Sequence, residues 1–107
     1  MENLDQLLER IIEVIVAEVQ PEQIILFGSR ADGSANVESD YDLMVVVRGD
    51  VDERMTSRRI YRALFRERIP AAVDVVVVNA ASLRRRRTRH HDVARWALEQ
   101  GRIVHVA

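Results

Sequence analysis

Three aspartates give the sequence its clearest chemical signal. Asp40 and Asp42 stand two residues apart at the start of an apolar run, and Asp74 interrupts a run of valines. Residues two apart on a strand point to the same face, about 7 Å from each other. Neighbouring carboxylates repel, and each raises the pKa of the other unless a cation lies between them. The Asp40–Asp42 pair therefore predicts a metal site.

Magnesium fits this pair best, because it takes carboxylate oxygens, keeps several waters and accepts phosphate oxygens from a nucleotide. Asp74 would be an expensive buried charge in a purely structural strand, so we expect its strand to lie beside the pair. Three carboxylates can hold two metal ions, one activating an attacking hydroxyl and one binding a triphosphate. Asp74 could also act as the general base. An isolated Asp-x-Asp is common at strand ends, and only its combination with Asp74 and a phosphate-binding turn favours a catalytic site.

Gly28, Ser29 and Arg30 follow a short apolar run and supply that turn. Glycine lets the backbone approach a phosphate without a Cβ in the way, and the Ser29 hydroxyl and backbone N–H can donate hydrogen bonds to it. Arg30 can neutralise triphosphate charge, or it can pair with Asp32 or Glu38 at the surface. The three residues are therefore predicted to bind a nucleotide.

Alternating helices and strands must position these residues. Helical periodicity and β-branched runs predict elements in the order α-β-loop-β-α-β-α-β. The helices are expected at residues 4–19, 51–68 and 82–100. The strands are expected at residues 23–27, 41–47, 72–78 and 102–106, with the second strand buried on both faces. The loop at residues 29–39 leaves room for at most one helical turn.

The two later helices are rich in arginine. In the middle helix, we expect an apolar stripe and a solvated back; the stripe comprises Met55, Tyr61, Leu64 and Phe65. In the last helix, the run Arg84–Arg87 suggests nucleic acid, but no aromatic residue is interleaved with it. The run therefore favours contact with an acidic partner surface over direct nucleic-acid binding. His90 and His91 diverge by about 100° on a helix and are not expected to share a metal.

Composition narrows the class of protein. The sequence has 107 residues, of which 48% are hydrophobic, and we expect a single domain over residues 1–107. The net charge of -1 indicates neither a nucleic-acid binder nor an acidic tail. The lack of cysteine excludes disulfides, thiolate zinc sites and cysteine nucleophiles, and is typical of a cytoplasmic protein. We expect no membrane span, because no apolar run is long enough, and no secretory signal.

The stretch from Gly28 to Leu43, with Gly-Ser followed by Asp-x-Asp and a later acid at Asp74, resembles the polymerase-β-like nucleotidyltransferase superfamily. It is most similar to the minimal nucleotidyltransferases (MNT), small prokaryotic proteins usually paired with a HEPN partner. The resemblance extends to the leading helix, the arginine-rich middle helix and the closing segment. Many such proteins have arginine where this sequence has Asp32, which leaves phosphate neutralisation more dependent on Arg30. The resemblance implies an α/β (α+β) fold, in which a short mixed sheet is flanked by helices.

For function, the resemblance implies a magnesium-dependent transfer of AMP from ATP to a hydroxyl. Asp40 and Asp42 would hold the metals, Asp74 would complete the site and help to deprotonate the acceptor, and the turn at residues 28–30 would bind the triphosphate. The partner would be a HEPN toxin ribonuclease in a heteromeric complex. The chain would be its antitoxin and would neutralise the toxin by adenylylating a tyrosine (AMPylation), by masking the toxin's site, or both.

Two other functions remain open. A non-catalytic antitoxin would neutralise by binding alone, and its arginine-rich helices would then matter more than its acids. A small-molecule nucleotidyltransferase would act on an aminoglycoside-like acceptor. Larger family members of that kind carry a helical second domain that helps to bind the acceptor, and the sequence leaves no residues for one, which favours an acceptor supplied by a partner.

Overall fold

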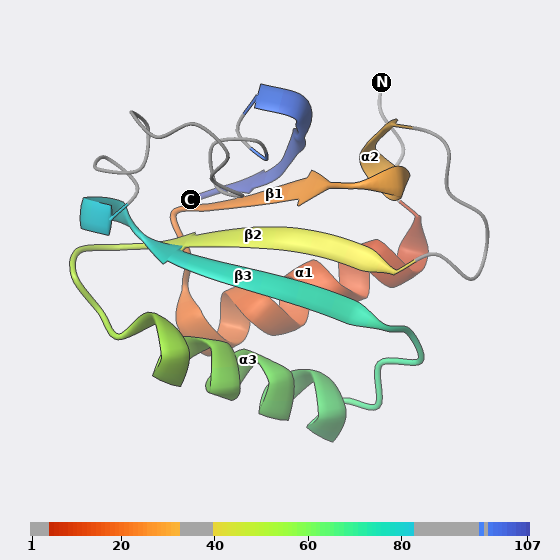
Figure 1. The fold of residues 1–107 in the computed structure, drawn as a ribbon. Helices are drawn as coiled ribbons and strands as arrows, with labels where there is room; N and C mark the ends of the chain where they lie inside the picture. The colour runs from red at the N-terminus through yellow and green to blue at the C-terminus, as the bar shows by residue number, and fades with distance from the viewer. Residues whose placement is uncertain (1–4, 33–39, 83–96, 98) are drawn as a thin grey trace.

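The computed structural model describes residues 5–32, 40–82, 97 and 99–107. Its centre is a sheet with the strand order β3-β2-β1-β4 (Figure 1). The strands are β1 (Gln23–Phe27), β2 (Tyr41–Val47), β3 (Val73–Asn79) and β4 (Arg102–Val106). Strand β1 pairs antiparallel with both β2 and β4, whereas β2 and β3 run parallel. The sheet is therefore mixed, as predicted.

Two helices, α1 (Gln6–Val19) and α3 (Glu53–Arg66), cover one face of the sheet (Figure 1). Each begins at an aspartate whose carboxylate accepts a backbone N–H of the first turn. Asp5 accepts from Leu8 at 2.6 Å, and Asp52 accepts from Met55 at 2.9 Å. A third helix, α2 (Ser29–Asp32), is a single turn after β1, in agreement with the prediction for that loop.

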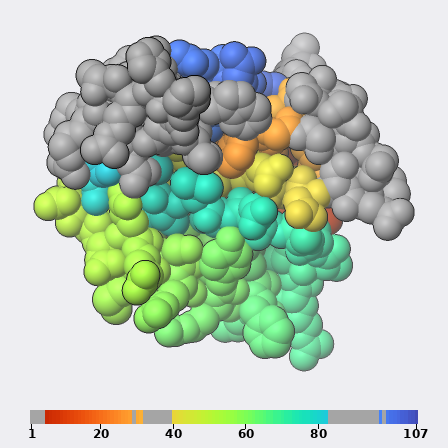
Figure 2. Space-filling model, in the orientation of Figure 1, coloured from red at the N-terminus to blue at the C-terminus, as the bar shows by residue number. Residues whose placement is uncertain are grey.

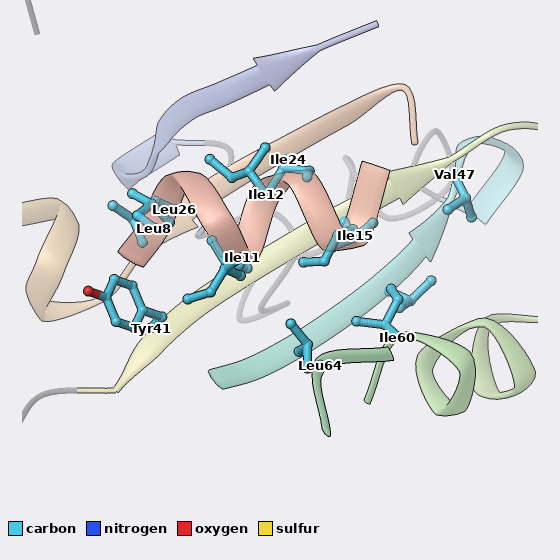
Figure 3. Close-up of a cluster of buried hydrophobic side chains, with 13 residues drawn as sticks. Leu8, Ile11, Ile12, Ile15, Ile24, Leu26, Tyr41, Val47, Ile60 and Leu64 are labelled. Atoms are coloured by element: carbon cyan, nitrogen blue, oxygen red, sulfur yellow. The ribbon is translucent and has the colours of Figure 1, made fainter. Parts of the chain in front are cut away.

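Side chains alternate along β2 and divide the interior into two clusters. The larger cluster lies between the sheet and the two long helices (Figure 3) and receives Tyr41, Leu43, Val45 and Val47 from β2. The smaller cluster, on the opposite face, receives Met44 and Val46, which pack with Ala97. Asp42 has the same parity as Met44, so it lies on the face opposite the two helices. Its register partner on β3 is Asp74, which therefore shares that face.

The predicted strands at residues 23–27, 41–47 and 102–106 coincide with β1, β2 and β4, and β3 begins and ends one residue later than predicted. Six of the seven residues of β2 are buried, which confirms that its two faces are covered. The helix predicted at residues 82–100 lies largely outside the described residues, as do Arg84–Arg87, His90 and His91. At its end, the backbone N–H of Gly101 donates to the carbonyl of Ala97 at 2.8 Å. None of the helices in the described ranges is long and apolar enough to cross a bilayer.

The apolar stripe predicted for α3 was wrong. Met55, Tyr61 and Phe65 are 60%, 42% and 87% exposed, and only Leu64 of the four faces the core. The buried residues of α3 are instead Thr56, Ile60, Ala63 and Leu64. These positions follow the i, i+4, i+7, i+8 spacing of one helical face, and the prediction failed because it chose the largest side chains over the best-spaced ones.

Candidate active site

The predicted aspartates gather where β2 and β3 begin. Asp42 and Asp74 are direct neighbours in the parallel register, on strands that lie about 4.8 Å apart in a sheet. Asp42 is partly buried, whereas Asp74 and Asp40 are exposed. The structure thus brings Asp42 and Asp74 side by side on one face, with Asp40 at the entrance to β2.

The environment of Asp42 disfavours its charge. Burial raises the pKa of the Asp42 carboxyl above its ordinary value of 3.8, and the negative charges of Asp74 and Asp40 raise it further. Among the ion pairs formed by the described residues, none involves any of these three carboxylates. The three carboxylates therefore repel one another, and no basic side chain of the described residues forms an ion pair with them to offset this repulsion.

The three carboxylates do not converge on one point. In the described ranges, no three acidic, histidine or cysteine side chains lie close enough to form a ligand set for a metal ion. Magnesium is commonly bound through one or two carboxylates, with waters and substrate phosphates completing its shell. The neighbouring carboxylates of Asp42 and Asp74 fit that donor requirement, and Asp40 stands near enough to influence the charge of Asp42.

Gly28 brings the backbone against this acidic edge. Its φ is +76°, a left-handed conformation that suits glycine, and a Cβ built on it would collide with Oδ2 of Asp42. The preceding residue, Phe27, is the partner of Asp42 across the β1–β2 pair. Ser29 then begins α2. The predicted phosphate-binding turn therefore passes directly beside the carboxylate, as a site that joins a triphosphate to a metal requires.

The side chain of Arg30 lies away from Asp42, against Tyr41 and Asp5. Its guanidinium carbon is 3.9 Å from the centre of the Tyr41 ring, and its Nη1 is 3.9 Å from Oδ2 of Asp5. Tyr41 belongs to the helix side of the sheet, the side opposite Asp42. The sequence allowed Arg30 either a triphosphate or a surface acid, and the structure gives it Asp5, which the sequence analysis did not consider.

Asp5 and Tyr41 are the positioning residues that the sequence analysis missed. The Tyr41 hydroxyl donates to the Asp5 carboxylate at 3.1 Å, and the same carboxylate caps α1 through Leu8. Burial and the charge of Asp5 raise the pKa of Tyr41, so its hydroxyl stays protonated and remains a donor. An aspartate before an amphipathic helix could have been recognised as a cap, but its contacts with Arg30 and Tyr41 depend on tertiary packing.

The family model described as polymerase beta, nucleotidyltransferase matches residues 9–92. The chain belongs to this family. The matched range holds every residue that we predicted for the site, from Gly28 to Asp74. No curated protein sequence matches the chain.

Two solved structures resemble this nucleotidyltransferase-family chain. One is a candidate nucleotidyltransferase from Sulfolobus solfataricus, with 25% sequence identity and a TM-score of 0.58, covering 94% of this chain and 86% of the other. The second is a toxin–antitoxin structure with AMP-PNP, with 22% identity and a TM-score of 0.57, covering 92% and 73%. The first supports the family and the fold, and the second supports the fold.

Proposed function

We propose that this chain is a magnesium-dependent nucleotidyltransferase that moves AMP from ATP to a hydroxyl group. The observation that carries the proposal is the pair of neighbouring carboxylates, Asp42 and Asp74, directly beside the Gly28 turn. Family membership supports nucleotidyl transfer as the reaction class. ATP is proposed as the donor because a structure of the same fold was solved with AMP-PNP.

In the proposed reaction, the carboxylates of Asp40 and Asp42 would hold magnesium, and Asp74 would complete the site. The acceptor hydroxyl oxygen attacks the α-phosphorus of ATP, the bond from that phosphorus to the bridging oxygen breaks, and pyrophosphate leaves. The acceptor proton passes to the carboxylate of Asp74. Bound magnesium would supply positive charge to the triphosphate and would lower the pKa of the acceptor.

The turn at residues 28–30 binds the triphosphate in this proposal. Gly28 allows the backbone to approach the phosphates, and Ser29 donates its hydroxyl and N–H. Arg30 assists only if it leaves Asp5, because its guanidinium is held between that carboxylate and the Tyr41 ring. Arg30 would therefore bind the triphosphate only after a rearrangement, whereas Gly28 already brings the backbone close to Asp42.

For the acceptor, we propose a tyrosine of a cognate HEPN toxin, with this chain acting as the antitoxin in a heteromeric cytoplasmic complex. Resemblance to a toxin–antitoxin structure supports a protein partner. We also propose that residues 1–107 form a single minimal nucleotidyltransferase domain, and the family match over residues 9–92 supports this.

The test combines the purified chain with ATP labelled at the α-phosphate and magnesium, with and without the protein encoded by the adjacent gene. We expect label on that protein, with loss of label in Asp42→Ala and after chelation of the metal. Asp50→Ala serves as a matched control, because Asp50 is an exposed turn residue away from the site. No label with the wild type, together with toxin neutralisation that survives Asp42→Ala, would leave an antitoxin that acts by binding.

A further inference from the structure

The outer face of α3 combines exposed apolar and basic side chains. It consists of the residues that face away from the buried positions Thr56, Ile60, Ala63 and Leu64. Successive helix residues turn by about 100°, which places six residues on this face; they are Arg54, Met55, Arg58, Tyr61, Arg62 and Phe65. All six are exposed. The helix lies at the edge of the molecule beside β3 (Figures 1 and 2), and among these six residues Tyr61 reaches back to the sheet through its hydroxyl.

Exposed apolar side chains are concentrated on this segment. Six large apolar side chains are exposed among the described residues, and three of them, Met55, Tyr61 and Phe65, lie on the outer face of α3. Phe65 is 87% exposed. Single exposed apolar residues are normal on a protein surface, but a group of them on one element indicates a contact surface.

The arginines of α3 fall into two groups. Arg59 and Arg66 turn towards α1 and each bond to the carboxylate of Glu18 at 3.2 Å. Both bonds hold the pKa of Glu18 below its ordinary value. On the outer face, Arg54, Arg58 and Arg62 form no ion pair or hydrogen bond with the described residues. One group fastens the helix to α1, and the other is available to a partner.

The adjacent edge of the sheet is already occupied by α3. The Tyr61 hydroxyl accepts the backbone N–H of Val75 at 2.8 Å, and the Glu53 carboxylate accepts that of Asn79 at 2.9 Å. Val75 and Asn79 belong to β3, an outer strand of the sheet. Side chains that take up the N–H groups of an edge strand block the addition of another strand. A partner at this side therefore meets the side chains of α3.

We propose that the outer face of α3 binds a protein surface with an apolar centre and acidic side chains around it. Phe65 and Met55 would fill the apolar centre, and Arg54, Arg58 and Arg62 would pair with the acids. Arginine, tyrosine, phenylalanine and methionine are enriched in protein interfaces. A second copy of this chain is a poor occupant, because a two-fold contact would place the arginines against themselves.

This surface is separate from the candidate active site. Asp42 and Asp74 lie on the face of the sheet opposite α3, so a partner on α3 leaves the acidic edge open. The inference therefore does not rest on the proposed transfer of AMP, and the two can fail independently.

The test uses a defined probe, a labelled synthetic helical peptide with leucines on one face and glutamates beside them. Its counterpart carries lysines in place of the glutamates, and a labelled oligouridylate represents nucleic acid. We expect the acidic peptide to bind with micromolar affinity by fluorescence anisotropy, and the basic peptide at least about tenfold more weakly. Phe65→Ser, and separately Arg58→Glu with Arg62→Glu, should each weaken binding by about tenfold.

Arg48→Glu is the matched control, since Arg48 is exposed, outside α3 and without an ion pair to the described residues. It should leave peptide binding within about twofold. Thermal melts confirm that each variant folds. The proposal is overturned if the acidic peptide does not bind, if both peptides bind equally, or if the α3 variants match the control. Tighter binding of oligouridylate, lost in the double arginine variant, would also overturn it and assign the face to nucleic acid.

Discussion

Tyr41 and Asp42 are neighbours in sequence but belong to opposite sides of the sheet, and their surroundings differ in kind. On the helix side, the Asp5 carboxylate meets the Tyr41 hydroxyl, the guanidinium of Arg30 and a backbone N–H. On the other side, Asp42 meets two further carboxylates. The first set of charges is compensated within the chain, whereas the second accumulates charge of one sign.

The two sides of the sheet differ in whether their charges are balanced within the chain. A compensated cluster stabilises the fold and does not need a ligand. A group of like charges raises the free energy of the folded protein until a cation arrives, which is a common property of sites that bind or react. Asp5, Tyr41 and Arg30 balance one another within the fold, whereas the acids at the start of β2 and β3 have an arrangement that a cation would stabilise.

The largest expected effect comes from removing charge on the acidic side. We expect Asp42→Asn to lower the rate of AMP transfer by about 10²–10³-fold, the usual loss when one group that stabilises transition-state charge is removed. Tyr41→Phe, on the compensated side, should change the rate only a few-fold. The measurement is the initial rate of label transfer at saturating ATP. A rate for Asp42→Asn within a few-fold of the wild type would show that the acidic edge is not the catalytic centre.

The next effect concerns the turn that brings the backbone to Asp42. We expect Gly28→Ala to destabilise the protein by about 2–3 kcal/mol in urea unfolding, because it combines a left-handed φ with a clash against the carboxylate. Gly49→Ala is the matched control, since Gly49 has a similar φ of +66° but nothing within 4 Å of its Cβ position. It should cost about 1 kcal/mol. Equal losses would mean that the Asp42 contact contributes nothing.

A smaller effect follows from the raised pKa of Asp42. The folded protein holds this proton more tightly than the unfolded chain does, so ionisation weakens the fold as the pH rises from 3.8 towards the higher folded pKa. At neutral pH, we expect Asp42→Asn to melt a few degrees above the wild type, with the gain shrinking as the pH falls below 4. Magnesium should raise the melting temperature of the wild type more than that of the variant. A gain that grows at acidic pH would contradict this sign.

The comparison between the two sides also separates what the sequence could predict from what it could not. The two-residue spacing of Asp40 and Asp42 before an apolar run and the single acid among the valines of β3 are local signals, and they led to the neighbouring Asp42 and Asp74. The Gly28 turn could also be predicted, because glycine directly after an apolar run marks a turn at the end of a strand.

The contacts of Arg30 could not be predicted from the sequence. Asp5 lies 25 positions before Arg30 in the sequence, and only the packing of α1 on the sheet brings its carboxylate there. The buried face of α3 was misassigned for a related reason, since size and hydrophobicity favoured Phe65 whereas the packing selected Ile60 and Ala63. The sequence could predict which residues form the acidic edge, but tertiary contacts decided which acid pairs with Arg30 and which apolar residues of α3 are buried.

The smallest expected effect concerns Asp5 on the helix side of the sheet. It tests whether Arg30, which pairs with Asp5, can also take part in binding the triphosphate. Asp5→Asn keeps the cap of α1, because asparagine caps as well as aspartate, but it removes the negative charge from the ion pair with Arg30. We expect a loss of stability below about 1 kcal/mol, since the ion pair is long and partly exposed. If Arg30 contributes to phosphate binding, its release should tighten the binding of magnesium-ATP a few-fold by calorimetry, and adding Arg30→Gln should remove the gain. Glu9→Gln, an exposed acid in the same first turn, controls for the change in net charge. Unchanged affinity in Asp5→Asn would assign Arg30 to the framework alone, and triphosphate binding would then depend on magnesium and the Gly28 turn.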